Sequence, residues 1–320
     1  FETTRTGVLE DDDYIISDDY FKTLFKSDNI IHYNYNFRST SSDFNELLDN
    51  ARTGFSLCNN EIKERCLTLL NTRRRISANI NINHEFFDSE LYNLYNNSLK
   101  TTLKNDTVDG INEREIRNLI SNNNINCVFN REVLCSIDTF RTNGNNSLIP
   151  NIDSIYNAII KYMDSLNGYK IDFVAVVGER VMLRQNNLHQ ELKNGSLGTI
   201  TEINEEECII KVNFDNVGEI CVPMNTWTHP EYSIMKIKAF PLIPAWAITI
   251  HKLQGQSISS PMFILLYGCN IERRQHLLYT AISRMTDINN LYIIHNRAIG
   301  EECFPLCDIM FEWYRRNCLM

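Results

Sequence analysis

The sequence predicts an α/β protein in which helices flank a mostly parallel sheet, with a small inserted β-barrel and a helical insertion. Strand-like apolar runs at residues 245–250, 262–267 and 291–295 alternate with helix-like segments such as residues 273–285, an order typical of parallel sheets. Between residues 171 and 224 the pattern changes to short strand-like runs separated by Gly and Asn turns. This second pattern predicts a small barrel or sheet.

The composition is that of an ordinary globular protein, and 320 residues are enough for two domains. With 43% hydrophobic and 22% charged residues, the chain has no apolar run of membrane-spanning length and no signal-peptide pattern. We therefore expect an intracellular protein without a membrane partner. Ten cysteines with no C-x-x-C pair and no regular Cys/His spacing predict reduced thiols and no metal site. The net charge of −9 argues against indiscriminate coating of nucleic acid but is compatible with a local basic groove.

The first half of the chain supports three local predictions. Residues 43–52 form an amphipathic helix that ends at Gly54, with Phe44, Leu47, Leu48 and Ala51 on one face. Residues 66–71, CLTLLN, read as a short buried strand, and the following basic segment reads as a helix that starts at Thr72. Residues 84–168 are rich in Asn and carry no recognisable chemistry. Such runs can be disordered, but the recurring Ile, Leu, Phe and Tyr favour an ordered insertion or peripheral subdomain.

Two segments near the C-terminus carry the strongest functional pattern. In residues 245–257, AWAITIHKLQGQS, an apolar strand runs directly into a polar turn. In residues 278–284, LYTAISR, Arg284 ends a helical run of small residues. Open α/β sheets bind ligands outside the carboxyl ends of their strands, so such a turn is a candidate phosphate-facing site. Together the two segments resemble the fifth and sixth motifs of superfamily 1B DNA helicases of the RecD and petite-integration-frequency type.

Further segments match the same family in the same order along the chain. YNFRS at residues 35–39, with the helix after it, resembles the fourth motif, and CLTLLNTRRRISANI resembles the following strand and helix. FVAVVGERVMLRQN and NGSLGTI resemble the segments that flank a Src-homology-like barrel. The match spans residues 20–295 and leaves only residues 84–168 without a counterpart. The resemblance implies a second RecA-like lobe with an inserted barrel.

On this resemblance the chain divides into five parts. Residues 1–30 are the tail of a preceding lobe or a linker, residues 31–83 the first part of the second RecA-like lobe, residues 84–170 the partly helical insertion, residues 171–240 the barrel, and residues 241–320 the rest of the lobe with a C-terminal helix.

The resemblance also implies which residues meet ATP. In this family ATP and Mg²⁺ lie between two lobes and are held mainly by the first lobe, while arginines of the second lobe reach the γ-phosphate. Arg38 and Arg284 match those arginines, and a guanidinium suits the task because its planar fork donates two hydrogen bonds and stays protonated. Gln254 matches a residue that couples nucleotide to DNA, and Gly255 allows the backbone to approach a phosphate. Without the resemblance, each arginine would read as a surface or ion-paired side chain.

Single-stranded DNA is the expected macromolecular partner. Thr249, His251 and Lys252 lie where the family contacts DNA through phosphate hydrogen bonds and charge. Asn71 and Arg73 are further DNA-binding candidates, although basic segments at helix ends are often merely exposed. By itself, His251 would read as a structural histidine.

The ATP-binding half of such an enzyme has no counterpart in this sequence. The chain contains no Gly-Lys dipeptide, which the phosphate-binding loop requires, and no Asp-Glu pair follows an early apolar strand. We therefore expect the C-terminal part of a 5′–3′ helicase of replication or repair, inactive without its first lobe. The alternative is a non-catalytic scaffold or binding module of a replication complex. An unrelated α/β hydrolase is disfavoured because no G-x-S-x-G elbow or metal-binding His pair is present.

The abundance of Asn, Ile, Tyr and Phe is typical of an AT-rich genome. With the resemblance, it suggests the replicative helicase of a large DNA virus. A primase or other replication proteins would then be partners, and the nucleus or a viral replication site the location.

Overall fold

The computed structural model describes residues 38–75, 88–123, 127–130, 132–135, 172–215, 217–228, 235–266 and 277–304. Predictions for residues 1–37 and 305–320 fall outside these ranges. The helix expected to start at Thr72 falls partly outside them, because residues 76–87 are not among the described residues. The chain divides into two compact units, one of Phe1–Asp109 with Ala247–Met320 and one of Gly110–Trp246.

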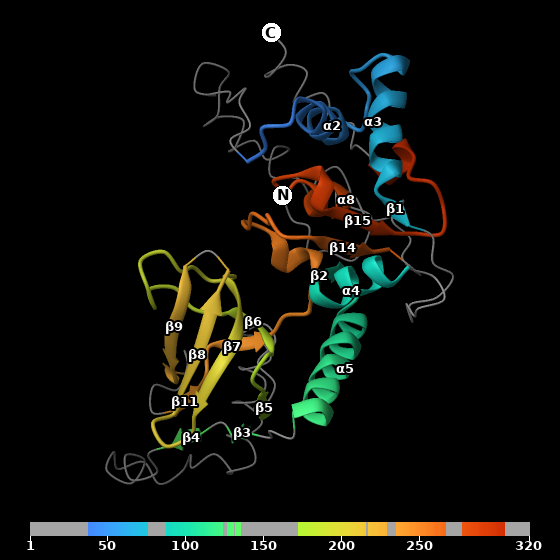
Figure 1. The fold of residues 1–320 in the computed structure, drawn as a ribbon. Helices are drawn as coiled ribbons and strands as arrows, with labels where there is room; N and C mark the ends of the chain where they lie inside the picture. Colours follow the sequence, from blue (N-terminus) through green and yellow to red (C-terminus); the bar gives the residue numbers. More distant parts are fainter. Residues whose placement is uncertain are drawn as a thin grey trace, which may run out of the picture. The chain divides into compact units, whose positions relative to one another are not determined.

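A parallel sheet forms the centre of the first unit (Figure 1), as predicted. Its strand order is β1 (Arg74–Arg75), β15 (Leu291–Ile294), β14 (Met262–Leu265), β2 (Leu99–Thr102) and β13 (Ala247–Thr249), and every neighbouring pair is parallel. Three of these strands lie within the apolar runs that predicted them. Because parallel strands need crossover connections, helices cover the sheet.

One face of this sheet packs against α4 (Ser89–Asn97). Register places Lys100, Phe263 and Tyr292 side by side on adjacent strands, so their side chains share a face. Tyr95 of α4 meets Phe263 edge to face with ring centroids 5.1 Å apart, and Phe263 stacks on Tyr292 at 4.7 Å. The Lys100 ammonium is buried over the Tyr95 ring at 4.9 Å, which lets a charged residue occupy the sheet centre.

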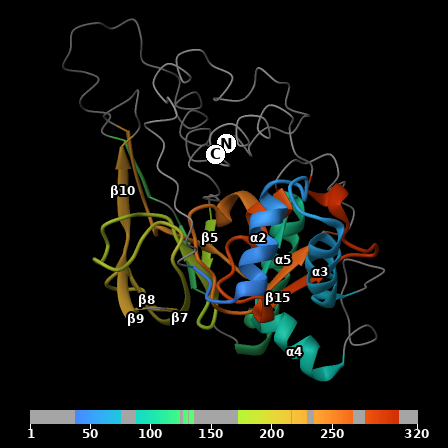
Figure 2. The ribbon, with the colours of Figure 1, turned by 90° about the horizontal axis from the view of Figure 1, so that it is seen from above.

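The helices α2 (Ser42–Arg52), α3 (Asn60–Thr72) and α8 (Leu277–Ile282) lie on the opposite side of the sheet from α4 (Figure 1), and α2 and α3 lie side by side (Figure 2). The four apolar residues predicted for the first of these helices are all buried. The Ser41 hydroxyl caps the helix by accepting from the Phe44 N–H, and Gly54 follows its end with φ +57°. The amphipathic helix and its stop are therefore confirmed.

The strand predicted at residues 66–71 is wrong, because those residues belong to α3. Cys66 and Leu70 are buried one helical turn apart, and Asn59 caps the helix by accepting from the Ile62 N–H. Thr72 ends this helix instead of starting the next one, and β1 follows. The short run CLTLL fits either element by composition, and the cap at Asn59 is the local signal that distinguishes a helix from a strand here.

Residues 84–170 differ from the peripheral insertion that the sequence suggested. They contribute β2, which lies between β14 and β13 in the parallel sheet. They also supply α4 and α5 (Asn105–Asn123), and in the second unit β3 (Cys127–Asn130) and β4 (Glu132–Cys135). The sequence of β2, LKTT, has no apolar run, and the buried Lys100 ammonium is stabilised by the Asn96 carbonyl and the Tyr95 ring. Hydrophobicity alone could therefore not detect this strand.

The second unit contains most of α5 and, in its described part from residue 172 on, antiparallel strands joined by turns, which confirms the predicted β pattern. Its five-stranded sheet has the order β12 (Leu242–Pro244), β6 (Arg180–Leu183), β7 (Leu197–Asn204), β8 (Ile209–Phe214) and β9 (Gly218–Pro223). Two smaller sheets join β10 (Asn225–Thr228), β11 (Met235–Ala239) and β4, and β3 with β5 (Asp172–Ala175).

Buried and more exposed residues alternate along β8, and the buried ones belong to the hydrophobic core of this unit. Ile210, Val212 and Phe214 are buried, whereas the residues between them are more exposed. Gly198 on β7 faces this strand so closely that an added Cβ would lie 2.6 Å from Val212 Cγ1. The close approach of the two strands therefore requires a glycine.

Within the described ranges, no helix is long and apolar enough to cross a membrane.

Candidate functional site

Two arginines distant in sequence meet in the first unit. The Arg38 guanidinium donates from Nη1 to the Ser283 carbonyl oxygen at 2.7 Å and from Nε to the Ser257 hydroxyl at 2.9 Å. The Arg284 guanidinium donates from Nη2 and Nε to the Ser283 hydroxyl at 3.0 and 3.3 Å. The structure thus brings Arg38 and Arg284 together around one serine.

Ser283 can hold both arginines because it lies just after the end of α8 and is itself fixed. Its backbone N–H donates to the Tyr279 carbonyl at 2.9 Å, and its hydroxyl donates to the Thr280 carbonyl at 3.1 Å. With its own hydrogen used in this way, the hydroxyl presents lone pairs to Arg284. Only 4% of Ser283 is exposed, so the arrangement is built into the fold.

The two positive charges influence each other. Burial, and next the charge of Arg38, lower the pKa of the Arg284 guanidinium, which nevertheless stays protonated at neutral pH. Burial raises the pKa of the Tyr279 hydroxyl, and the positive charges of Arg284 and Arg38 oppose this rise. In the part of the chain that the structure describes, Arg284 forms no ion pair with a carboxylate. Paired guanidiniums in this setting favour an anion between or beside them.

The turn that carries Gln254 and Gly255 leads into the same site. It begins with a 3-10 helix, Ile250–Leu253, which follows β13 directly. Gly255 has φ +81°, a conformation that L side chains rarely adopt, and open space surrounds the position of its missing Cβ. Gln254 and Gly255 are both exposed. Gln254 lies three residues before Ser257, to which Arg38 donates.

The turn follows the carboxyl end of β13, as the sequence suggested, whereas Ser257 and Arg284 lie further along the chain's return. Since β13 and β14 are parallel, the chain between them must return from the carboxyl edge to the amino edge. Ile258 has already paired with Met285 on this return, and Ile258 N–H donates to the Arg284 carbonyl at 2.8 Å. Ser257 and Arg284 therefore lie on segments that enter the amino ends of β14 and β15, and Arg38, from the segment before α2, contacts both segments.

The DNA-binding candidates fall into two separate places. Thr249 ends β13 and is 5% exposed, whereas His251 and Lys252 in the 3-10 helix are half-buried. His251 and Lys252 are thus partly exposed, whereas Thr249 is buried.

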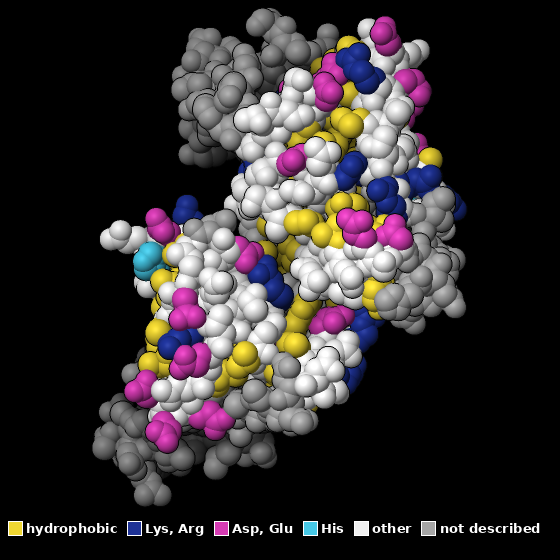
Figure 3. Space-filling model, in the orientation of Figure 1, with side chains coloured by type: hydrophobic (Ala, Val, Ile, Leu, Met, Phe, Trp, Pro, Cys, Tyr) yellow, Lys and Arg dark blue, Asp and Glu magenta, His cyan; other side chains and the backbone are white. Residues whose placement is uncertain are grey.

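Asn71 and Arg73 precede β1, at the opposite edge of the sheet from β13. Four strand spacings, about 19 Å, separate those edges. The Asn71 side chain exchanges two hydrogen bonds of 2.9 Å with the Ile299 backbone, and Arg73 Nε donates to the Leu291 carbonyl at 3.1 Å. Figure 3 shows Lys and Arg side chains over this β1 region. The hydrogen bonds give Asn71 and Arg73 a structural role that the sequence did not indicate.

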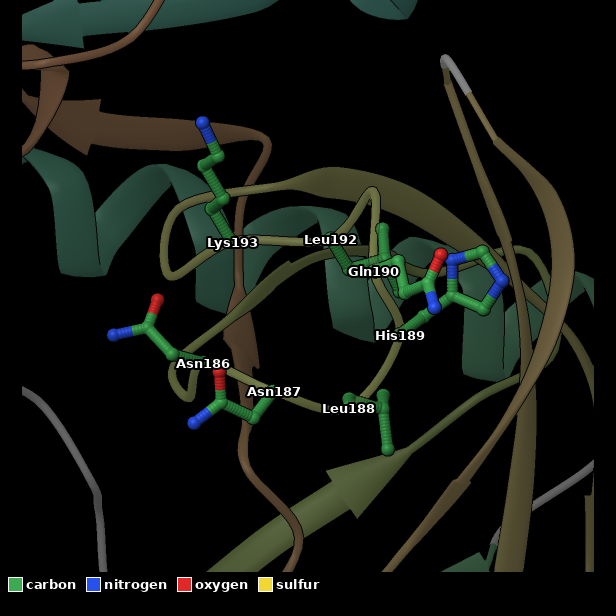
Figure 4. Close-up of a pocket in the computed structure, with 7 residues that line it drawn as sticks. All are labelled: Asn186, Asn187, Leu188, His189, Gln190, Leu192 and Lys193. Atoms are coloured by element: carbon green, nitrogen blue, oxygen red, sulfur yellow. The ribbon is translucent and has the colours of Figure 1, made fainter.

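The surface of the second unit differs in charge. In Figure 3, Asp and Glu side chains gather over β7, β8 and β9, and the exposed acids there include Glu202, Glu206 and Glu219. The β6–β7 loop holds a depression of ≈ 980 Å³ with mixed polar and apolar walls, lined by Asn186, Asn187, Leu188, His189, Gln190, Leu192 and Lys193 (Figure 4). None of the residues predicted for ATP or DNA line it.

Sequence reasoning missed Ser257 and Ser283, the two residues that organise the arginines. Both lie inside the motifs already quoted, but a lone serine carries no signal of its partner.

Among the described residues, no three His, Cys, Asp or Glu side chains form a metal-binding group. Burial raises the pKa of the Cys66 thiol to about 11, so this cysteine is an unreactive thiol at neutral pH.

The parallel sheet with helices on both faces defines a RecA-like α/β fold, and the paired arginines are typical of a site that receives an anion. No family model matches the sequence. The chain is 27% identical over 151 residues to the ATP-dependent DNA helicase Pif1 of Bdellovibrio bacteriovorus, covering 45% of this chain and 33% of the relative. It is 30% identical over 138 residues to the enzyme of the same name from Campylobacter jejuni, covering 39% and 30%.

Solved structures of Pif1 share the fold. Unliganded Pif1 from Bacteroides superposes with a TM-score of 0.58 at 20% identity, over 89% of this chain and 56% of that one. Bacteroides Pif1 in complex with ADP-AlF3 and single-stranded DNA superposes with a TM-score of 0.54, over 90% and 56%. The chain thus has low-identity homology to Pif1-like helicases, and its matches span about a third of the curated relatives and just over half of the solved chains.

Proposed function

We propose that this chain is the second-lobe part of an ATP-dependent DNA helicase. The single observation that supports this most is the convergence of Arg38 and Arg284 on Ser283, across 245 residues of sequence. Homology to Pif1-like helicases and the RecA-like fold support the same proposal. The finer features, a Src-homology-like barrel in the second unit and 5′ to 3′ polarity, belong to the proposal as well.

In this proposal the arginine pair receives the γ-phosphate of ATP held by a first lobe. The donor set fits such a ligand, because Arg284 is half-buried, lacks a carboxylate among the described residues and has a pKa lowered by burial and by Arg38. A phosphate would relieve the repulsion between the guanidiniums and accept their N–H groups. ATP supplies the bond that is broken, and Mg²⁺ would be held by the first lobe. Arg38 and Arg284 would stabilise the charge that builds up on the transferred phosphoryl group.

Single-stranded DNA would pass the turn after β13. Lys252 and His251 offer charge and hydrogen-bond donors to phosphates at that turn. Gln254 and Gly255 follow within three residues of Lys252 and are exposed. DNA and nucleotide would therefore act on one short segment. Primase or other replication proteins, an intracellular or nuclear location and a viral source remain proposals that rest on the family resemblance and the composition.

The test is the ATPase of the longest natural protein that contains this chain. Arg284→Ala is expected to lower DNA-stimulated turnover by at least a hundredfold, and Arg284→Lys is expected to restore little, because a lysine lacks the planar fork. Arg65→Ala is the matched control, since Arg65 is an exposed arginine of α3 paired with Glu46. Wild-type-like turnover by Arg284→Ala would contradict the assignment.

The isolated 320-residue chain is expected neither to hydrolyse ATP nor to unwind DNA. If the longest natural protein also binds DNA without any ATPase, the alternative of a helicase-like scaffold is favoured. If turnover is present and depends on Arg284, the scaffold is excluded.

A further inference from the structure

We propose that Ser257 is a positioning residue that couples single-stranded DNA at the turn to the nucleotide contact of Arg38. This inference rests on the proposed function and adds a route between its two ligands. The observation behind it is the 2.9 Å hydrogen bond from Arg38 Nε to the Ser257 hydroxyl. That bond joins the DNA-contacting turn to an arginine that otherwise belongs to a segment 219 residues away.

Hydrogen bonds tie the turn internally from His251 to Gln256, the residue before Ser257. Gln254 N–H donates to the His251 carbonyl at 3.3 Å, and Gln256 N–H donates to the Leu253 carbonyl at 3.0 Å. The Gln256 side chain donates to the Lys252 carbonyl at 3.0 Å. A displacement of Lys252 or His251 by DNA is therefore carried along the turn to Ser257.

Beyond Ser257 the chain is fastened to the second arginine. Ile258 N–H donates to the Arg284 carbonyl at 2.8 Å, and Thr286 N–H donates to the Ile258 carbonyl at 3.0 Å. The segment after the turn thus cannot move without moving the backbone of Arg284. Ser257 lies between the turn and this backbone bridge, and it is the residue through which the turn acts on Arg38.

Orientation of the guanidinium is what the serine controls. Arg38 donates from Nη1 to the fixed Ser283 carbonyl and from Nε to Ser257, and both contacts constrain the plane of the fork. A phosphate contact depends on that plane, because guanidinium donors lie in a rigid, planar arrangement. Movement of Ser257 rotates the fork about the Ser283 contact and alters its fit to the γ-phosphate.

The first experiment measures the ratio of DNA-stimulated to basal ATPase in the longest natural protein that contains the chain. Ser257→Ala is expected to lower that ratio about tenfold, the effect of losing one hydrogen bond to a charged group. Ser257→Thr keeps a hydroxyl and is expected to restore most of the ratio. Ser260→Ala removes the hydroxyl of a nearby exposed serine and is expected to leave the ratio within twofold of wild type.

The second experiment uses the 320-residue chain and needs no turnover. The Nε–H resonance of Arg38, assigned with Arg38→Lys, is followed by nitrogen-15 NMR during titration with an oligo-dT strand. It is expected to shift in the wild type and in Ser257→Thr, and to stay in place in Ser257→Ala. DNA affinity, measured in the same titration from the backbone signals of the turn, is expected to change less than twofold.

The outcomes separate this inference from the proposed function. An unchanged ATPase ratio in Ser257→Ala, or an Arg38 signal that still responds to DNA in that variant, overturns the coupling while leaving the helicase assignment intact. Equal loss of basal and stimulated turnover also overturns it, because Ser257 would then only support the site. A wild-type protein without DNA-stimulated ATPase contradicts the proposed function itself, and the NMR titration still decides whether DNA reaches Arg38.

Discussion

A buried carboxyl group in the second unit gives a quantitative prediction about stability. Glu179 follows Gly178 in the turn between β5 and β6 and is fully buried. Its Oε2 accepts from the Val176 N–H at 3.1 Å, whereas Oε1 is buried without a hydrogen-bond partner among the described residues. Burial raises the pKa of the Glu179 carboxyl well above its ordinary value, and the bond from Val176 offsets this only in part. The folded protein therefore holds a neutral Glu179 over a range of pH in which the unfolded chain has lost that proton.

The direction of the pH dependence follows from this difference. Since the folded state binds the proton more tightly, the free energy of unfolding falls as pH rises from the unfolded pKa, about 4.3, towards the raised folded value. Each pH unit in that window costs about 1.4 kcal/mol.

Glu179→Gln tests this reasoning. Glutamine has the shape of the neutral acid and keeps an acceptor for the Val176 N–H, but it cannot ionise. The variant is expected to lose the Glu179 share of the pH dependence and to be more stable than wild type at pH 7 and above. Urea unfolding followed by circular dichroism from pH 5 to 8 measures both effects. Glu206→Gln, at an exposed turn position, is the matched control. If Glu179→Gln keeps the pH slope of the wild type, the argument from burial is refuted.

Three further predictions follow from particular contacts. Gly198→Ala is expected to destabilise the second unit by about 1–3 kcal/mol, because the new methyl group would meet Val212 Cγ1 at 2.6 Å; a thermal midpoint equal to wild type would contradict the close approach. Asn71→Ala is expected to cost about 1–3 kcal/mol in urea unfolding by removing both bonds to the Ile299 backbone, and an equal midpoint with weaker DNA binding would return Asn71 to the DNA site. Lys252→Ala is expected to weaken binding to oligo-dT and to reduce the slope of log affinity against log salt by about 0.7, whereas an unchanged slope would exclude a phosphate contact by Lys252.

Prediction succeeded where local pattern and tertiary role agree. The helix of residues 43–52 has a cap, an apolar face and a glycine stop in its own sequence, and the structure has all three. The strands of the second unit alternate with a period of two, as in β8, and were found in place. It failed where a segment depends on partners far along the chain. The strand LKTT is defined by its pairing with β13 and β14, which its own sequence does not indicate.

The sequence by itself determined the class of fold and named both arginines. Apolar periodicity is a local property, and the motif residues match a family in order along the chain. Only the tertiary structure decided that Arg38 and Arg284 share Ser283 and that Arg284 lies on the segment towards the amino end of β15. It also decided that Asn71 forms hydrogen bonds with the Ile299 backbone. The physical reason is that a hydrogen bond between residues more than 200 positions apart depends on how the sheet and its crossovers bring them together, and no local pattern of residues encodes that.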